Sequence, residues 1–355
     1  MLRASARPAC LALLLLAASA VGAAEPPNPG SKDPVGPEGP AGDPGGPGGP
    51  GGPGGPGGPG GPGGFGGSGD EPGFGIVWYP SASVTGQGTE LGMVRNRLSA
   101  EVPVWFKGSD ALMASLGVDE SHFSGEALLP DSQRAFPSDL WKVQVGLKHM
   151  RQYSSGATRM LLFDVESASD KPFQSSRDID YTVGGFYLKP AKNGRDSWTL
   201  GAIYSPLGYP NFPIPLVSYN WNRSKTFRMS LGIPLSMSWQ PIDDLSLDVS
   251  VNPGGGDAIA TYKISDRSGA YGGYQQVSDQ YFLSDRLDKK EAFFALEKRW
   301  IVGVRRDVGK GVSFNLNAGY AFDRRYGEGD DERDLDDRVD LEPTSFLGAK
   351  LIWNF

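Results

Sequence analysis

The sequence predicts an all-β chain that closes into a single antiparallel up-and-down barrel. Three observations predict it: long segments in which apolar and polar residues alternate, connections that are short and long by turns, and a last strand that ends on an aromatic residue. Alternation is informative because successive side chains of a strand point to opposite faces. Residues 73–355 are enough for one large domain.

The N-terminus precedes this pattern and indicates export. Residues 1–23 contain two arginines, an apolar run at 11–18, and the small side chains of Val21 and Ala23 near the end. This order is typical of a cleaved secretory signal peptide, and the run is shorter than the ~20 residues of a membrane-spanning helix. Cys10 would leave with the signal, so the mature chain would contain no disulfide.

Residues 24–72 form a Gly/Pro-rich segment in which glycine recurs at every third position from Gly36 to Gly69. This period is also the requirement of the collagen triple helix. Most triplets are Gly-Gly-Pro, however, and the second glycine raises the entropy that ordering would cost. We therefore expect a disordered, collagen-like spacer, which would reach on the order of 150 Å if it were extended.

The remaining residues, 73–355, carry the alternation. In 311–323 the apolar residues Val312, Phe314 and Leu316 alternate with Ser313 and Asn315, and segments 226–239 and 244–252 repeat the arrangement. A soluble barrel would turn the apolar face inward, whereas a transmembrane barrel turns it outward. Several segments exceed the roughly nine to eleven residues of a tilted bilayer-spanning strand, while soluble strands average about five or six. Strand length favours the transmembrane barrel.

We expect about fourteen strands, with 12 or 16 as alternatives. Tight connections such as 107–110, 154–156, 192–195, 223–226, 253–256 and 307–311 alternate with mostly long ones, as in barrels with short periplasmic turns and longer external loops. Residues 240–244 are short for an external loop, and 267–289 could hide another strand pair. The expected strands lie near 74–85, 91–106, 110–120, 140–153, 157–168, 179–189, 196–205, 215–222, 226–239, 244–252, 257–266, 290–306, 311–323 and 344–355.

The C-terminal residues are the most specific signal. Leu351, Trp353 and the terminal Phe355 share one face of the last predicted strand. This strand resembles the C-terminal strand of Gram-negative outer-membrane β-barrels, and more narrowly the chain resembles the uncharacterised families among them. The resemblance implies recognition of these three residues by the barrel-assembly machinery and placement in the cell outer membrane. Both the N-terminal spacer and the C-terminus would then be periplasmic.

The polar faces of the predicted strands would line the barrel interior. Charges of both signs are mixed there, so a water-filled lumen and an interior closed by ion pairs both remain open. We favour a porin-like channel for passive diffusion of small polar solutes, with lumen charges and external loops setting specificity. The residues expected to face the lumen are Arg97, Glu101, Lys142, Gln144, Asp164, Glu166, Arg228, Asp248, Lys263, Glu297, Arg299, Asn315, Asn317 and Lys350.

Two other functions are weighed against the channel. One is a closed structural or binding barrel, tethered to peptidoglycan or a periplasmic protein through residues 24–72. The other is a lipid hydrolase: His122 and Ser124 have the His-x-Ser spacing of outer-membrane phospholipases, but Gly125-Glu126 stands where those enzymes have asparagine-glycine. Spacing alone supplies neither a group that orients the histidine nor oxyanion donors. His149 lies on an apolar face and is expected at the membrane interface.

No cofactor or metal is expected. The carboxylate-rich run 327–340 lacks the ligand spacing of an EF-hand loop, so we expect a solvated external loop. The partners of the barrel would be outer-membrane lipid and lipopolysaccharide. The formal charge of −7 lacks the basic footprint of a nucleic-acid-binding protein.

Overall fold

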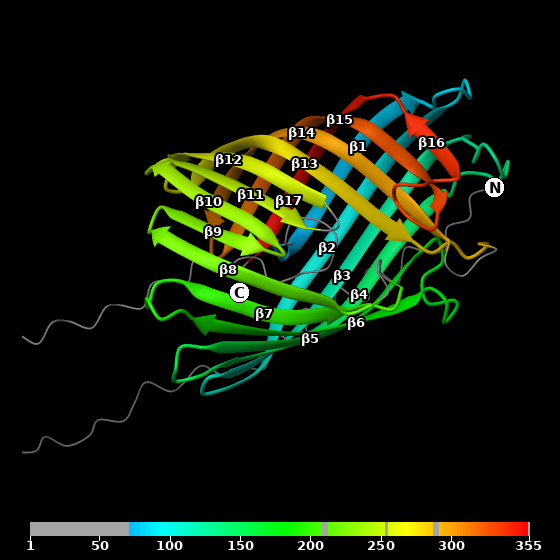
Figure 1. The fold of residues 1–355 in the computed structure, drawn as a ribbon. Coiled ribbons are helices and arrows are strands. Elements are labelled where there is room, and N and C mark those ends of the chain that lie inside the picture. The colour runs from blue at the N-terminus through cyan, green and yellow to red at the C-terminus, as the bar shows by residue number, and fades with distance from the viewer. Residues whose placement is uncertain (1–70, 208–211, 253–254, 287–290, 354–355) are drawn as a thin grey trace, which may run out of the picture. The chain divides into compact units, whose positions relative to one another are not determined.

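The computed structural model describes residues 71–207, 212–252, 255–286 and 291–353, and the regular structure within them is β-strand (Figure 1). The predicted signal peptide, nearly all of the spacer, and Phe355 lie outside these residues. In the described ranges no helix is long and apolar enough to cross a membrane. The strands are β1 (Gly73–Ser83), β2 (Glu90–Lys107), β3 (Asp110–Gly125), β4 (Asp139–Gln152), β5 (Thr158–Ser169), β6 (Ile179–Pro190), β7 (Ser197–Tyr204), β8 (Ile214–Ser224), β9 (Phe227–Gly232), β10 (Leu235–Ile242), β11 (Leu245–Asn252), β12 (Gly255–Ser265), β13 (Ser268–Tyr281), β14 (Ala292–Gly309), β15 (Val312–Gly329), β16 (Asp337–Leu341) and β17 (Thr344–Trp353).

The sheet closes on itself. Every neighbouring pair is antiparallel, and β1 pairs with both β2 and β17, so no free edge remains between the first and last strands. The short β16 pairs with one end of β15, whose other end pairs with β17, and Leu341 of β16 also bridges Val84 just after β1. The closed barrel therefore has 16 strands. We call the end where β1 begins and β17 finishes the near end, and the opposite end the far end.

The main expectation of fourteen strands is wrong by two, and the alternative of 16 is confirmed: one predicted strand is a hairpin of two strands, and one further strand was missed. The predicted strand 226–239 is two strands, β9 and β10, which pair with each other through Ser230 and Ser236. They reverse direction at residues 233–234, just after Gly232, whose φ is 146°. The reversal leaves the alternation unbroken, because Leu231, Ile233 and Leu235 follow one another at every second position. Periodicity alone therefore cannot reveal this turn.

The strand β13 fills part of the segment 267–289 that the sequence left open. Its glycines weaken the alternation, and Gly273 is required sterically: a Cβ there would lie 2.1 Å from the carbonyl oxygen of Ala258. Because of these two corrections, two connections lie at the opposite end of the barrel from the one expected. Residues 243–244 join β10 and β11 at the near end, whereas β11 and β12 meet at the far end, where 253–254 lie outside the described residues.

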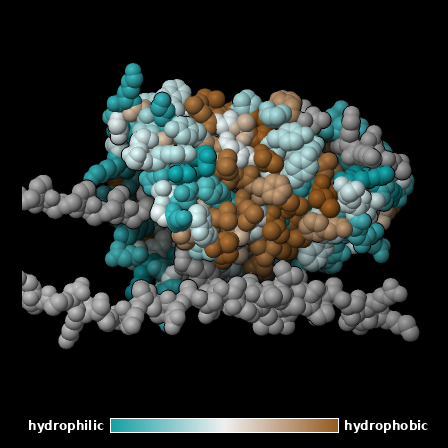
Figure 2. All heavy atoms as spheres, turned by 90° about the horizontal axis from the view of Figure 1, so that it is seen from below, coloured by the Kyte–Doolittle hydropathy of each residue, from teal (hydrophilic) through white to brown (hydrophobic). Residues whose placement is uncertain are grey.

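The outward face of the barrel carries an apolar band. Along β14, Trp300, Val302 and Val304 are 56%, 63% and 51% exposed, whereas Ile301 between them points inward and is 8% exposed. Figure 2 shows hydrophobic residues gathered in the middle of one face, with hydrophilic residues toward both ends. This is the reverse of a soluble barrel, in which the outward face is polar.

Candidate functional site: the interior of the barrel

The inward faces differ strongly around the barrel, and two regions need names. The filled side consists of β1–β5 together with β13, β14, β15 and β17, and it holds most of the main core cluster, the rest of which lies in loops and in β16. The open side consists of β9–β12, whose strands are only 6 to 11 residues long. The longest strands, β2, β14 and β15, have 18 residues each and all belong to the filled side.

A network of five charged side chains crosses the interior of the filled side. Asp119 accepts hydrogen bonds from Arg95 at 2.6 Å and from Arg97 at 2.7 Å. Asp279 on β13 lies 2.9 Å from the Arg95 guanidinium and 3.3 Å from the Lys142 ammonium. Both carboxylates are nearly fully buried. Because β13 is not a sheet neighbour of β2 or β4, the Asp279 pairs bridge the interior and close off the filled side at this level.

The backbone supports the same crossing. The N–H of Phe282, just after β13, donates a 2.7 Å hydrogen bond to the carbonyl of Ala168 on β5. Next to it, the hydroxyl of Ser284 donates to Asp170 at 2.7 Å. The far ends of β5 and β13 are therefore joined across the barrel, and the filled side is separated from the rest of the interior there.

A second polar cluster lies beside the first. Tyr79 donates a 2.8 Å hydrogen bond to Glu297, and Arg299 lies 3.2 Å from the same carboxylate. The guanidinium of Arg324 is 1% exposed and stacks 4.9 Å from the centre of the Tyr79 ring. Its Nε is 3.9 Å from Glu297 Oε2. Charges buried this completely are costly to leave without a counter-ion, so the cluster requires all its members.

The loop 126–138 closes the filled side toward the far end. The ring of Phe136 packs edge-to-face against Phe123, Phe293 and Tyr326, with centroid distances of 5.1, 5.5 and 5.6 Å. The backbone N–H groups of residues 131 and 132 donate to the buried carboxylate of Asp337 at 2.8 and 3.1 Å. Arg134 forms an ion pair with Glu328.

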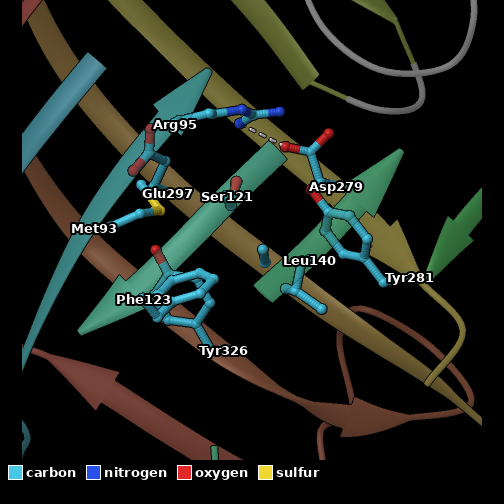
Figure 3. Close-up of a pocket in the computed structure, with 10 residues that line it drawn as sticks. Met93, Arg95, Ser121, Phe123, Leu140, Asp279, Tyr281, Glu297 and Tyr326 are labelled. Atoms are coloured by element: carbon cyan, nitrogen blue, oxygen red, sulfur yellow. Dashed lines mark ion pairs between the residues drawn. The ribbon is translucent and has the colours of Figure 1, made fainter. Parts of the chain in front are cut away.

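The cavity left between these groups is small. Its volume is about 20 Å³, room for about one water molecule. Arg95 and Asp279 face each other on one side of it, and Phe123 and Tyr326 lie on another (Figure 3). Polar solutes larger than water do not fit here, so any passage must follow a different part of the interior.

The open side has the opposite character. Arg228, Ser238 and Asp248 stand directly opposite one another on β9, β10 and β11, forming one cross-strand row on the inward face. Arg228 and Asp248 are exposed to solvent although they face inward. Among the described residues neither forms an ion pair. The row is flanked by inward hydroxyl groups on Ser230, Ser236, Ser246, Ser250 and Thr261.

Between the two sides lies an inward apolar patch that the sequence analysis did not anticipate. It consists of Leu162, Phe186, Ile203 and Leu216, all buried, on β5 to β8. Each of these apolar residues occupies an inward position. The sequence analysis expected polar residues at such positions, because it assigned the polar face of each strand to the interior. The patch gives the interior an apolar surface next to the hydroxyl groups of the open side.

The residues expected in the lumen fall into these regions as follows. On the filled side, Lys148 bonds Glu101 at 2.8 Å, and Tyr271 donates to Asn315 at 2.8 Å. Lys350 stands opposite both Gly75 and Asn315. Lys263 on the open side pairs with Asp266 at 2.7 Å in the following turn. The other expected residues on the filled side are Arg97, Lys142, Gln144, Asp164, Glu166, Glu297, Arg299 and Asn317, on β2, β4, β5, β14 and β15.

Sequence reasoning missed four charged members of the site. Arg95 lies two residues before Arg97 on the same face, so strict extension of the alternation would have included it. Asp119 and Asp279 needed the register of β3 and the existence of β13. Arg324 lies beyond a shift in β15 near Asp323, whose φ is 49°, and this shift turns even-numbered residues inward. No periodic signal predicts that change.

Three other expectations can be placed. Leu351 is an exposed outward residue of β17, and the N–H of Trp353 donates to the carbonyl of Pro72 at 3.0 Å. The run 327–340 is not one solvated loop: its two ends belong to β15 and β16, and Glu328 is buried. The reason is pairing of β16 with β15 and contact with the loop 126–138. In the described residues no cluster of potential ligands could hold a metal ion.

The two histidines both face outward and both meet a carboxylate. His122 Nδ1 lies 2.7 Å from Asp139 on β4, and His149 Nε2 lies 3.3 Å from Asp110. Ser124 follows His122 on the same face of β3, with its hydroxyl near Gly92 of β2. No hydrogen bond joins Ser124 to His122 in the described chain.

No family model and no curated protein matches the chain. Solved structures with a similar fold include an outer-membrane channel from Pseudomonas putida F1, at 9% identity and a TM-score of 0.36, covering 83% of this chain and 99% of the other. OccK7 (OpdD) of Pseudomonas aeruginosa is 11% identical with a TM-score of 0.36, covering 80% and 98%. A mutant porin of Rh. blastica is 7% identical with a TM-score of 0.30, covering 81% and 99%. The function is therefore argued from this chain's own residues.

Proposed function

We propose that the chain is an outer-membrane barrel whose open side is a passive passage for small polar solutes. The observation that carries the proposal is the row Arg228, Ser238 and Asp248. Two charged side chains that face the interior, yet are exposed to solvent, require water beside them. The apolar outward band supports the membrane placement, because exposed apolar surface of this extent needs lipid to cover it.

The near end would face the periplasm. Connections at the near end are short, such as residues 108–109 and 310–311, while those at the far end include the longer segments 126–138 and 330–343. Outer-membrane barrels place short turns in the periplasm and longer loops outside. A cleaved signal at residues 1–23 would deliver the chain there. The assembly machinery would act on the last strand at Leu351, Trp353 and Phe355.

Single-channel conductance in planar bilayers tests the passage. We expect steady, salt-dependent steps from the refolded, signal-free protein, and the same steps after deletion of residues 25–72. Reversal potentials under a salt gradient should then shift when Arg228 or Asp248 is replaced by a neutral residue. Silence from a preparation with the circular dichroism of folded β-sheet would exclude the channel.

The second candidate is a closed barrel that binds a partner through its spacer. It is favoured by the ion pairs that cross the filled side, because these close a large part of the interior. Under this proposal, retention on peptidoglycan or on a periplasmic protein would require residues 24–72. A protein that is silent in bilayers and loses retention upon deletion of these residues would support the second candidate over the channel.

The third candidate is a lipid hydrolase, and one contact favours it. Asp139 holds His122 through Nδ1, which is the orienting contact a serine esterase needs and which the sequence did not reveal. Its test is phospholipid hydrolysis by the purified protein and by Ser124→Ala. Activity that depends on Ser124 would establish the hydrolase, whereas no activity, or activity unchanged by Ser124→Ala, would exclude it.

A further inference from the structure

The two ends of the barrel carry opposite charge. The near-end rim, defined as residues 106–111, 151–159, 189–197, 222–228, 240–245, 263–268 and 305–312, contains 14 lysines and arginines but 6 aspartates and glutamates. The described far-end connections, 84–89, 126–138, 170–178, 205–207, 212–213, 233–234, 282–286, 291 and 330–343, contain 6 basic and 14 acidic residues. The overall charge of the chain conceals this separation.

Many near-end cations have no carboxylate partner. Lys189, Lys192, Arg223 and Lys225 lie around the near ends of β6 to β9, and none forms an ion pair within the described structure. The one nearby carboxylate, Asp196, is already occupied by hydrogen bonds from its own turn and from β8. These four cations therefore present their charge outward to whatever lies against the rim.

Aromatic rings mark the same level of the barrel as a membrane interface. The guanidinium of Arg223 lies 5.8 Å from the ring centre of Trp221, and that of Arg151 lies 5.5 Å from the ring centre of Tyr153. Trp198 and Tyr219 pack 4.9 Å apart on the neighbouring strands. Tryptophan and tyrosine favour the headgroup level, where one end of the ring is apolar and the other is wet. The unpaired cations lie just beyond these rings.

We propose that this cationic rim binds the phosphodiester headgroups of anionic glycerophospholipids in the leaflet at the near end. The inference rests on the proposed membrane placement. Lysine and arginine side chains just beyond the apolar band are attracted to an anionic leaflet surface, and the attraction falls off within a Debye length. The acidic far-end loops would be repelled by the same headgroups, so the charge separation also favours one orientation of the barrel.

The test compares the protein in vesicles of phosphatidylcholine alone with vesicles that contain phosphatidylglycerol. We expect the thermal midpoint of wild type to rise with phosphatidylglycerol, and high salt to reduce the rise. The triple variant Lys189→Gln, Arg223→Gln, Lys225→Gln should lose most of it. The matched control Lys171→Gln, Arg177→Gln, Arg333→Gln removes three exposed far-end cations and should keep it.

The outcomes separate this inference from the proposals it rests on. Absence of a phosphatidylglycerol effect in inserted wild type, or an effect that survives in the near-end variant, overturns the lipid site while leaving the channel standing. A folded protein that does not insert into either vesicle overturns the membrane placement itself. If the near-end variant instead loses retention on peptidoglycan with an unchanged lipid response, the rim serves that polymer and the lipid proposal is wrong.

Discussion

The filled and open sides of the barrel hold the same kinds of charged side chain in opposite environments. Arg95 and Asp119 on the filled side are bonded to each other and the carboxylate is nearly fully buried, while Arg228 and Asp248 on the open side face solvent with Ser238 between them. The first pair joins neighbouring strands, whereas the second pair is in contact with solvent. An inward charge is therefore not in itself evidence of a pore, because its meaning depends on what stands opposite.

The geometry accounts for the difference. On the filled side, β13 approaches β4 and β5 across the interior, so carboxylates from one wall reach cations on the other. The loop 126–138 then fills the far end with aromatic rings. The open side has short strands, and five of its inward side chains are serines, which are too small to reach across. Long side chains whose charges are paired across the interior close one region, whereas Arg228 and Asp248 on the open side form no ion pair within the described structure and are exposed to solvent.

The largest expected effect comes from Asp119→Ala on the filled side. Removing this carboxylate takes from Arg95 and Arg97 the partner that they share and leaves Arg95 only Asp279, which should cost about 3 kcal/mol of unfolding free energy, the lower limit for breaking a buried ion pair. The matched change on the open side, Asp248→Ala, should alter it by less than about 0.5 kcal/mol. Urea unfolding in phospholipid vesicles measures both. Equal losses would show that the two sides do not differ in this way.

A smaller effect is expected in the loop that covers the filled side. Leu129 is 1% exposed and its neighbour Leu128 is 40% exposed. Leu129→Ala should cost about 2–3 kcal/mol, because it opens a cavity in the packed cluster. Leu128→Ala should change stability by about 0.5 kcal/mol or less. The same urea titration applies, and a loss with Leu128→Ala as large as that with Leu129→Ala would contradict the packing of this loop.

The open side should respond in conductance and not in stability. Ser238→Trp places a large ring in the water beside the charged row, so we expect a partial block of single-channel current with an unchanged unfolding midpoint. Met237→Trp adds the same ring one residue earlier on the outward, lipid-facing side and should leave the current as it is. A current insensitive to Ser238→Trp would place the passage elsewhere.

The alternation of apolar and polar residues determines how much of the fold could be predicted from the sequence. It identifies a strand and its two faces, so most strands, the apolar outward band and the inward position of Arg97 or Asp248 were within reach. It is blind to a two-residue reversal that keeps the period, as at Ile233, and to strands whose alternation is weakened by glycine, as in β13. Each of these two errors changed the strand count by one. The connections between them were therefore assigned to the wrong end of the barrel.

Contacts across the interior could not be predicted from the sequence for a different reason. Asp279 meets Arg95, and Asp337 meets the loop at Ser132, through pairings between residues that are about two hundred positions apart in the sequence. No local pattern encodes such partners. Which inward charges are neutralised, and hence which side stays open, depends on these distant pairings, so the sequence leaves an open lumen and a closed one equally possible.

The smallest expected effect concerns Asp196, in the turn between β6 and β7 at the near end. Hydrogen bonds from Arg195, from the Tyr219 hydroxyl and from the backbone N–H of Asn222 lower the pKa of this carboxyl. Because the folded pKa lies below the unfolded value of about 3.9, the carboxylate stabilises the barrel above that pH and loses its contribution as pH falls through the folded pKa. Asp196→Asn should therefore lower the thermal midpoint at neutral pH.

The pH profile distinguishes this charge effect from a general weakening of the turn. The gap between wild type and Asp196→Asn should narrow steadily below about pH 4, as the wild-type carboxylate becomes protonated. Asp266→Asn is the control in another near-end turn. The pKa of Asp266 is also lowered, by its hydrogen bond from Lys263, but that pair is exposed and should contribute less. A gap for Asp196→Asn that stays constant down to strongly acidic pH would mean that the carboxamide disturbs the turn by its shape, and that the near end draws no stability from this charge.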